Sequence, residues 1–276
     1  MFRIPQLPRL AHPDANLADT LRVMNERRRV LALLGGAGLA ALLPRSPLAC
    51  TLIPQETEGP YPGDGTNGPN ALATSGIVRS DIRSSVGIAS PATAIGTPLT
   101  FTLQFLSTTD ACGFIEGLAV YVWHCDAQGR YSLYSQGVTG QNYLRGVQVT
   151  DASGRVTFTT VFPGCYMGRW PHIHFEVFAS LADATNGHNA GRISQLALPE
   201  AACSAVYAQS TLYPNSASNL SRVTLNSDGV FGDDGGVHQL ATVSGNNSDG
   251  YSAFLEVGLA VGATSSDLIF ANGFED

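Results

Sequence analysis

Lysine is absent from this chain of 276 residues, and all 15 of its basic residues are arginines. The protein therefore has no side-chain amine that could form a Schiff base with a carbonyl substrate. Charged residues make up only 13% of the sequence, and the acidic ones prevail, giving a net charge of −7. Since an acidic protein repels phosphate backbones, we expect no nucleic-acid partner.

Long hydrophobic runs are also missing. The main apolar run, residues 30–43, is rich in Ala, Leu and Gly and is shorter than the roughly 20 residues that span a bilayer as a helix. We therefore expect no stable membrane span. The run fits the apolar region of an export signal, and the arginines at 27–29 before it and Arg45 after it are similar to a twin-arginine signal. An amphipathic or buried helix is the alternative.

These features suggest three parts: an export signal at 1–49, one catalytic domain at 50–262, and a tail at 263–276 whose role the sequence leaves open. Residues 50–276 hold eight arginines against nineteen acidic residues, a net charge of −11. The twin-arginine route carries folded proteins, which suits a protein that acquires a metal before export to the periplasm or the exterior. Leu48-Ala49-Cys50 leaves a lipid anchor at Cys50 as a lesser alternative.

Cysteine is scarce, with five residues at positions 50, 112, 125, 165 and 203. None are spaced Cys-x-x-Cys, which argues against thiolate metal sites. They are consistent with disulfides in an oxidising compartment, and the odd count leaves at least one unpaired within a monomer.

Short alternating or apolar segments predict an all-β fold, an antiparallel β-sandwich with long irregular connecting loops. Only residues 200–209 have a helical pattern, and residues 57–95 are rich in turn-forming residues. We expect strands at 99–105, 118–123, 156–162, 222–225, 238–243 and 251–261.

The most informative stretch is 163–175, which contains His172 and His174. On a strand, side chains two residues apart point to the same face, so these imidazoles can share one metal ion. Tyr166 and Arg169 lie just upstream. A second strand end carries Trp123 and, after a turn, Tyr131.

Together these segments resemble the intradiol ring-cleavage dioxygenases, non-haem iron(III) enzymes that open catechols between their hydroxyls. Five motifs occur in the order of that family, over about residues 50–260. They read Thr-Glu-Gly-Pro-Tyr at 57–61, Trp-x-x-x-x-x-Gly-x-Tyr at 123–131, Leu-Arg-Gly-x-Gln-x-Thr-Asp at 144–151, Pro-Gly-x-Tyr at 163–166 and Arg-x-x-His-x-His at 169–174.

The resemblance implies that non-haem Fe(III) is the cofactor and that Tyr131, Tyr166, His172 and His174 are its ligands. It also implies that Tyr166, which the substrate displaces, and His172 are the axial pair. A phenol titrates near 10, so two phenolates at neutral pH require a strong Lewis acid, and Fe(III) suits this hard donor set better than zinc.

By the same resemblance, Arg169 lies over the substrate ring and Gln195 lines the same pocket. The substrates would be a small aromatic diol and O2, and the product a cis,cis-muconate-type diacid. In the family, the Thr-Glu-Gly-Pro-Tyr segment helps to form the active-site entrance and usually ends in two consecutive tyrosines. Tyr61 matches the first of these tyrosines, whereas Pro62 replaces the second. No helical dimerisation segment precedes Cys50, so a core-only member is expected. The particular catechol and the oligomeric state stay open.

Several alternatives accompany this interpretation. His172, His174 and Glu176 could instead form the facial triad of a cupin-like or extradiol Fe(II) enzyme, and a secreted, non-catalytic β-sandwich binding module is a third possibility. Tyr134 competes with Tyr131 as a ligand, although the Gly-x-Tyr spacing favours Tyr131.

Other polar residues near these motifs have structural interpretations. We expect His124 to be structural and Arg145, Gln148 and Asp151 to fix a loop. Because Cys125 and Cys165 each lie near an implied ligand tyrosine, we expect a disulfide between them.

Overall fold

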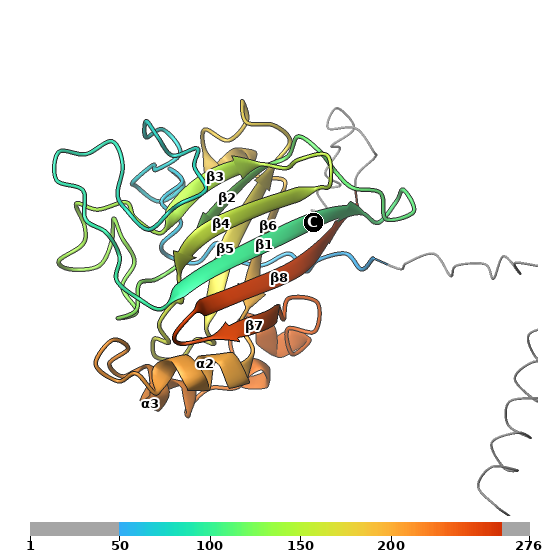
Figure 1. The fold of residues 1–276 in the computed structure, drawn as a ribbon. Helices are drawn as coiled ribbons and strands as arrows, with labels where there is room; N and C mark the ends of the chain where they lie inside the picture. Colours follow the sequence, from blue (N-terminus) through green and yellow to red (C-terminus); the bar gives the residue numbers. More distant parts are fainter. Residues whose placement is uncertain (1–49, 261–276) are drawn as a thin grey trace, which may run out of the picture. The chain divides into compact units, whose positions relative to one another are not determined.

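The computed structural model describes residues 50–260, and within them the chain forms two four-stranded sheets. Their strand orders are β4-β1-β8-β7 and β3-β2-β5-β6 (Figure 1). The strands are β1 Pro98–Ser107, β2 Ala119–Trp123, β3 Arg145–Val149, β4 Arg155–Val161, β5 His172–Phe178, β6 Arg192–Ala197, β7 Thr242–Asn246 and β8 Gly250–Leu259. The all-β sandwich is confirmed. Its sheets are not purely antiparallel, because β1 pairs with β8 in parallel while the other strand pairs are antiparallel.

The main hydrophobic core lies between the two sheets. Phe101 and Phe105 of β1 and Phe158 of β4 face Val122 of β2 and Phe175 of β5 in one buried cluster. The rings of Phe105 and Phe175 meet edge to face across the sandwich with centroids 6.4 Å apart. Strands β1, β2, β4, β5 and β8 contribute alternate residues to this layer, as expected for side chains that alternate between faces.

The outer face of the β3-β2-β5-β6 sheet is buried as well. Tyr121 and Trp123 of β2 and Phe178 of β5 pack there against Leu72 and Ile77 of the irregular segment before β1. This second layer explains why β2 is apolar throughout and why all seven residues of β5 are buried. Polar side chains on the outer face of β5 are therefore enclosed without entering the core.

The helical prediction at 200–209 is confirmed by α2, Glu200–Tyr207. The structure adds α3, Ser216–Leu220, and the 3-10 turns η1 Gly187–Asn189, η2 Leu225–Ser227 and η3 Phe231–Asp233. Figure 1 shows α2 and α3 beside one end of the sandwich. The strand expected at 222–225 is wrong, because Thr224 and Ser227 form a reciprocal capping box that turns the chain into η2. The strand expected at 238–243 begins only at Thr242.

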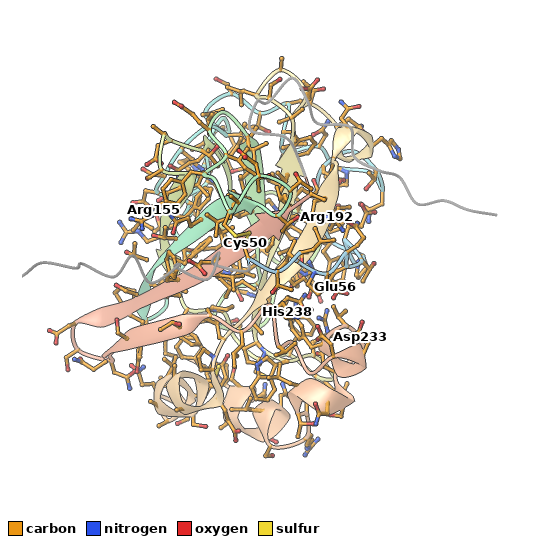
Figure 2. The ribbon with its side chains drawn as sticks, turned by 90° about the vertical axis from the view of Figure 1, so that its right-hand side faces the viewer. Cys50, Glu56, Arg155, Arg192, Asp233 and His238 are labelled. Carbon is orange, nitrogen blue, oxygen red and sulfur yellow. A yellow bond between two sulfur atoms is a disulfide. The ribbon has the colours of Figure 1, made fainter. Side chains whose placement is uncertain are left out.

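The predicted disulfide between Cys125 and Cys165 is also wrong. The bridge joins Cys50 to Cys112, whereas Cys125, Cys165 and Cys203 are free and buried. The thiols of Cys125 and Cys165 hydrogen-bond to nearby backbone carbonyls instead. We call residues 50–66, which precede β1, the entry segment, and Figure 2 shows it running from Cys50 towards Glu56. The bridge thus fastens the start of the described chain to the loop that follows β1.

The expected export signal at 1–49 and the tail at 263–276 lie outside the described residues, as do residues 261 and 262. Among residues 50–260, no helix is both long enough and apolar enough to cross a membrane.

Candidate metal centre

Four side chains from three parts of the chain converge at one point. The Tyr131 hydroxyl lies 3.3 Å from the Tyr166 hydroxyl and 3.3 Å from Nε2 of both His172 and His174. The two Nε2 atoms are 3.0 Å apart, and the Tyr166 hydroxyl is 3.2 Å from His172 Nε2. The structure thus brings together the four side chains that the sequence singled out as a ligand set.

Strand β5 positions the two histidines. His172 and His174 project from its outer face, while Ile173 between them enters the main core. Nδ1 of His172 bonds to the Trp170 carbonyl oxygen, so it carries the proton and leaves the Nε2 lone pair facing the centre. The His174 ring stacks on Trp123, with centroids 4.7 Å apart and planes 9° from parallel. The orientation of both rings is therefore fixed by neighbours outside the centre.

Two loops supply the tyrosines. The turn before Tyr131 is held by Asp126, whose carboxylate accepts from the backbone of Gln128 and Arg130. Gly129 has a φ of +80°, and a Cβ there would lie 3.1 Å from the Cβ of Tyr166. Glycine is therefore needed both for the turn and for the close approach of the two tyrosine loops. This packing explains why a glycine stands two residues before Tyr131 in the Gly-x-Tyr motif.

Burial keeps the four groups neutral when no cation is present. It raises the pKa of Tyr131 well above its ordinary value, and it raises the pKa of Tyr166 to about 12. It lowers the pKa of His172 to about 3 and that of His174 well below the ordinary value. Two neutral imidazoles offer lone pairs at any physiological pH, whereas the phenols ionise only beside a strong positive charge.

The spacing of the donors fits one ion. Ligand atoms about 2.1 Å from an ion and at right angles are about 3.0 Å apart, and atoms on opposite sides are about 4.2 Å apart. Five of the six donor pairs are separated by 3.0 to 3.3 Å. Tyr166 and His172, at 3.2 Å, cannot lie opposite each other. The expected axial pair is therefore wrong, and Tyr166 with His174, the one pair without such a contact, can be opposite.

Arg169 and Gln195 lie beside this centre and contact each other. Arg169 Nη2 donates to Gln195 Oε1 at 2.7 Å, and Gln195 Nε2 donates to the Thr57 carbonyl oxygen at 3.1 Å. Gln195 on β6 is directly opposite His174 on β5 in the strand register. Arg169 Nε donates to Asp228 Oδ2 at 2.9 Å, so the guanidinium is held from two sides.

The other aromatic candidates have distinct positions. The Tyr61 ring is exposed at 38% and lies 5.1 Å from the Tyr131 ring, at the outer side of the centre. The Tyr134 hydroxyl donates to Asn67 and accepts from the Gly63 backbone, away from the four donors. The structure therefore favours Tyr131 over Tyr134, as the spacing predicted.

The structural interpretations of His124 and Arg145 agree with their contacts. His124 is buried, with Nδ1 bonded to the Cys125 carbonyl oxygen and Nε2 to the Thr160 hydroxyl. Arg145 is buried and donates to the carbonyl oxygens of Tyr61 and Pro62. It thereby holds the entry segment against the sheet.

Glu176 does not complete a facial triad with the histidines. Its carboxylate lies within 4.8 Å of ligand atoms of Glu58 and Asp64, in a separate group. The third side chain at His172 and His174 is Tyr131 instead. This arrangement contradicts the alternative of an Fe(II) site built from His172, His174 and Glu176.

Sequence reasoning missed Asp228 and the role of Trp123. The Asp228 carboxylate accepts from Arg169 and from the Trp170 backbone, yet in sequence it is one aspartate before a glycine in a polar stretch. Trp123 belongs to a matched motif, but only its strand register with His174 reveals the stacking. A correct prediction that β2 pairs with β5 could have revealed the stacking of Trp123 on His174. No local sequence signal marks Asp228.

Comparison with known proteins gives a consistent result. A family model described as Dioxygenase matches residues 78–185, which include the four converging side chains and Arg169. The intradiol ring-cleavage dioxygenase from Tetranychus urticae is 29% identical with a TM-score of 0.56, covering 76% of this chain and 94% of that one. The structure of dioxygenase Tetur07g02040 is also 29% identical, with a TM-score of 0.58 and the same coverage.

A third solved structure is more distant. The dioxygenase domain of a dioxygenase carbohydrate-binding protein fusion from Streptomyces sp. SirexAA-E is 22% identical, with a TM-score of 0.48, covering 77% of this chain and 100% of that one. No curated protein sequence matches the chain. The family match across the site and the two structures at 29% identity agree: the chain is similar to the intradiol ring-cleavage dioxygenases, and these comparisons indicate an intradiol aromatic ring-cleavage dioxygenase.

Proposed function

We propose that this enzyme opens the ring of a catechol-type diol between its two hydroxyls, with O2 as co-substrate and a cis,cis-muconate-type diacid as product. We further propose that a non-haem Fe(III) ion is held by Tyr131, Tyr166, His172 and His174. The observation that carries the proposal is the convergence of two phenol oxygens and two imidazole nitrogens within 3.0 to 3.3 Å of one another in a buried place.

The donor set favours a hard trivalent cation. Two phenolates and two neutral imidazoles cancel two of the three positive charges, which lowers the cost of burying the ion. Phenolate oxygens and imidazoles suit Fe(III), whereas thiolates would suit softer metals. The chemistry that this ion supplies when bound is chelation of the diol and activation of its ring towards dioxygen.

Tyr166 is the residue best placed to give way to the substrate. Tyr131, His172 and His174 are only 2 to 3% exposed, whereas Tyr166 is half-buried and precedes Met167, which is 78% exposed. A diol therefore approaches from the side of Tyr166. The released Tyr166 phenolate can accept one substrate proton, because its pKa away from a cation is about 12. Tyr166 would thus be the base for one of the two hydroxyl protons, and a second acceptor such as a hydroxide ion would take the other.

Arg169 and Gln195 form the neighbouring wall. The guanidinium is held by Asp228 and Gln195, so its position is fixed before the substrate arrives. A fixed cation beside the diol stabilises negative charge that develops on the ring, at little reorganisation cost. Arg169 thus acts electrostatically, and Gln195 orients it from the entry segment through Thr57.

The visible spectrum of the purified, iron-quantified protein tests this proposal, followed by anaerobic titration with catechol. We expect about one iron per chain and a tyrosinate-to-iron charge-transfer band that shifts when catechol binds and changes again when air is admitted. The product should be the ring-opened diacid, identified by mass. A protein that stays colourless after reconstitution with iron(III) would overturn the proposed ligand set and favour a non-catalytic binding module.

We also propose that residues 1–49 direct export by the twin-arginine route. The support is the sequence pattern, arginines at 27–29 followed by a moderately apolar run. Replacing Arg27, Arg28 and Arg29 by Gln should retain full-length protein in the cytoplasm, measured by fractionation. Unchanged export of that variant would contradict the proposed route.

A further inference from the structure

Three carboxylates lie together on the outer face of β5, beyond His174 along the strand. Glu58 and Asp64 come from the entry segment, and Glu176 comes from β5. One ligand oxygen from each lies within 4.8 Å of the others. Asp64 and Glu176 are both 0% exposed, and Glu58 is half-buried. Such a group is therefore not a solvated acidic patch.

As charged carboxylates, the buried oxygens of this group have no hydrogen-bond donor among the described residues, although Asp64 and Glu176 are close enough to hydrogen-bond to each other if one of them is protonated. Both oxygens of Glu176 and Oδ2 of Asp64 are in this condition. The other oxygen of Asp64 is satisfied by the backbone and hydroxyl of Thr66. Because an unpaired buried carboxylate is costly, something that these contacts do not include compensates Glu176 and Asp64.

No side-chain cation in the described part of the chain supplies that compensation. The ion pairs formed there use Asp81, Asp126 and Asp228. Arg145 is close enough to influence Glu176 electrostatically. Its guanidinium N–H groups, however, donate hydrogen bonds to carbonyl oxygens and hydroxyls, including those of Pro62 and Ser132. His188 is close enough to influence Glu58, but among the described residues it forms no ion pair with any of the three carboxylates.

We propose that Glu58, Asp64 and Glu176 bind a hard divalent cation of the calcium class. Calcium is coordinated by carboxylate oxygens at about 2.3–2.6 Å, so ligands on opposite sides of it are roughly 5 Å apart. The observed separation within 4.8 Å fits this range. The glycine at 187 lets the Asp64 carboxylate take its place in this group, since a Cβ there would lie 1.7 Å from Asp64 Oδ2.

A proton shared between Asp64 and Glu176 is the competing explanation, and it compensates less. One proton satisfies one oxygen of each carboxylate, which leaves the second oxygen of Glu176 unpaired and two negative charges in the group. A divalent cation neutralises two charges and receives an oxygen from all three residues. The geometry therefore favours the cation.

The cation would tie the entry segment to the strand that carries the histidines. Glu176 follows His174 by two residues, and Gly59, next to Glu58, lies against the His174 ring. Tyr61, between the two entry-segment carboxylates, packs on the Tyr131 ring. Binding at this second site would thus fix the wall of the metal centre without supplying a ligand to it.

The test uses the full-length, iron-loaded protein after exhaustive dialysis against metal-free buffer. Calcium and iron per chain are measured by elemental analysis after re-equilibration with CaCl2, and thermal unfolding is recorded with CaCl2, with MgCl2 and with NaCl at equal ionic strength. We expect about one retained calcium per chain and a melting temperature that rises with CaCl2 more than with the other salts. Glu176→Gln should abolish both effects. The matched control Glu256→Gln, an exposed strand glutamate on β8, should keep both.

Two further variants make the result decisive. Tyr131→Phe, which removes a donor of the iron centre, should still bind calcium, so failure of the proposed iron site and failure of this site are distinguishable. If Glu176→Gln does not fold, Glu58→Gln at the half-buried rim should weaken calcium binding by at least about tenfold. Absence of calcium binding by the unaltered protein, or undiminished binding by Glu176→Gln or Glu58→Gln, would overturn the proposal in favour of the shared proton.

Discussion

Arg169 Nε lies 2.9 Å from Oδ2 of Asp228, whose side chain is completely buried while that of Arg169 is 18% exposed. Asp228 also accepts from the backbone N–H groups of Trp170, Val230 and Phe231. The carboxylate is therefore an anchor that joins the segment carrying Arg169 to the turn before η3. Positioning of the arginine depends on a residue 59 positions away in sequence.

Asp228→Asn should lower activity while leaving the iron centre in place. Asparagine keeps an acceptor oxygen for the backbone but removes the charge that holds Arg169. We expect a loss of about 1–3 kcal/mol in the free energy of unfolding, which is less than the roughly 3–5 kcal/mol for a broken fully buried pair because Arg169 is partly exposed. We also expect kcat to fall by at least about tenfold, from the loss of a fixed cation.

Denaturant unfolding, steady-state kinetics and the charge-transfer spectrum check this prediction. Asp81→Asn is the matched control, because Asp81 pairs with Arg83 at an exposed position and should cost less than about 1 kcal/mol. Full kcat in Asp228→Asn would show that the orientation of Arg169 is not important for turnover.

Tyr131→Phe and Tyr134→Phe should separate a metal ligand from a neighbouring structural tyrosine. Tyr131 is in contact with Tyr166, His172 and His174, whereas Tyr134 bonds to Asn67 and the Gly63 backbone. We expect Tyr131→Phe to lose most of its iron and activity. Tyr134→Phe should keep its iron and charge-transfer band and lose about 1 kcal/mol of stability through its hydrogen bonds. Equal iron content in the two variants would argue against Tyr131 as a ligand.

Reduction of the disulfide between Cys50 and Cys112 should lower stability without affecting the metal centre. The bridge spans 62 residues and lies at the end of β1, so its loss should cost about 2–4 kcal/mol. We expect a lower melting temperature in the Cys50→Ser, Cys112→Ser double variant and an unchanged charge-transfer spectrum. The three remaining thiols are buried and should resist alkylation in the folded protein. Rapid labelling of one of them under native conditions would contradict this arrangement.

His124 should contribute to acid sensitivity. Burial lowers its pKa from 6.5 to about 4, while its bond to the Cys125 carbonyl oxygen partly opposes that shift. Between these two values the unfolded chain binds more protons than the folded one, so this contribution to stability is complete above about pH 6.5 and is lost as the pH falls towards 4. The full effect is at most about 3 kcal/mol.

The measurement is the free energy of unfolding of the unaltered protein and of His124→Gln, both metal-free, across this pH range. The difference between the two isolates the contribution of His124, because all other groups titrate in both proteins. Metal-free protein is used so that loss of iron at low pH does not add to the slope. We expect a shallower decline in the variant. Identical pH dependence would mean that His124 is protonated without cost in the folded state.

The two-histidine motif and the Gly-x-Tyr segments could be interpreted from sequence because each depends on local geometry. Strand periodicity puts His172 and His174 on one face, and the turn that ends at Gly129 sets the direction of Tyr131. The continuous apolar character of residues 118–123 likewise predicted a strand, and the structure shows that both faces of β2 are buried. In each case the relevant interaction spans only a few residues.

The disulfide partners and the pairing of β1 with β8 could not be predicted in the same way. Cys125 and Cys165 are close to the tyrosine loops in sequence, but each thiol bonds to a carbonyl oxygen. Cys50 reaches Cys112 because the entry segment pairs through Leu52 with Gly258 at the end of β8. The parallel pairing joins residues about 150 positions apart. Such contacts follow from how the layers stack, which no local pattern encodes.

The sequence by itself determined the all-β class and the shared face of His172 and His174, since strand periodicity is a local property, and its resemblance to a known family supplied Tyr131 and Tyr166. Only the tertiary structure decided which donors can lie opposite each other, that Asp228 holds Arg169, and that Glu176 joins Glu58 and Asp64 rather than the histidines. Each of these relationships is a distance between segments that meet only when the two sheets and the entry segment pack together. Packing of distant segments, and not periodicity, sets those distances.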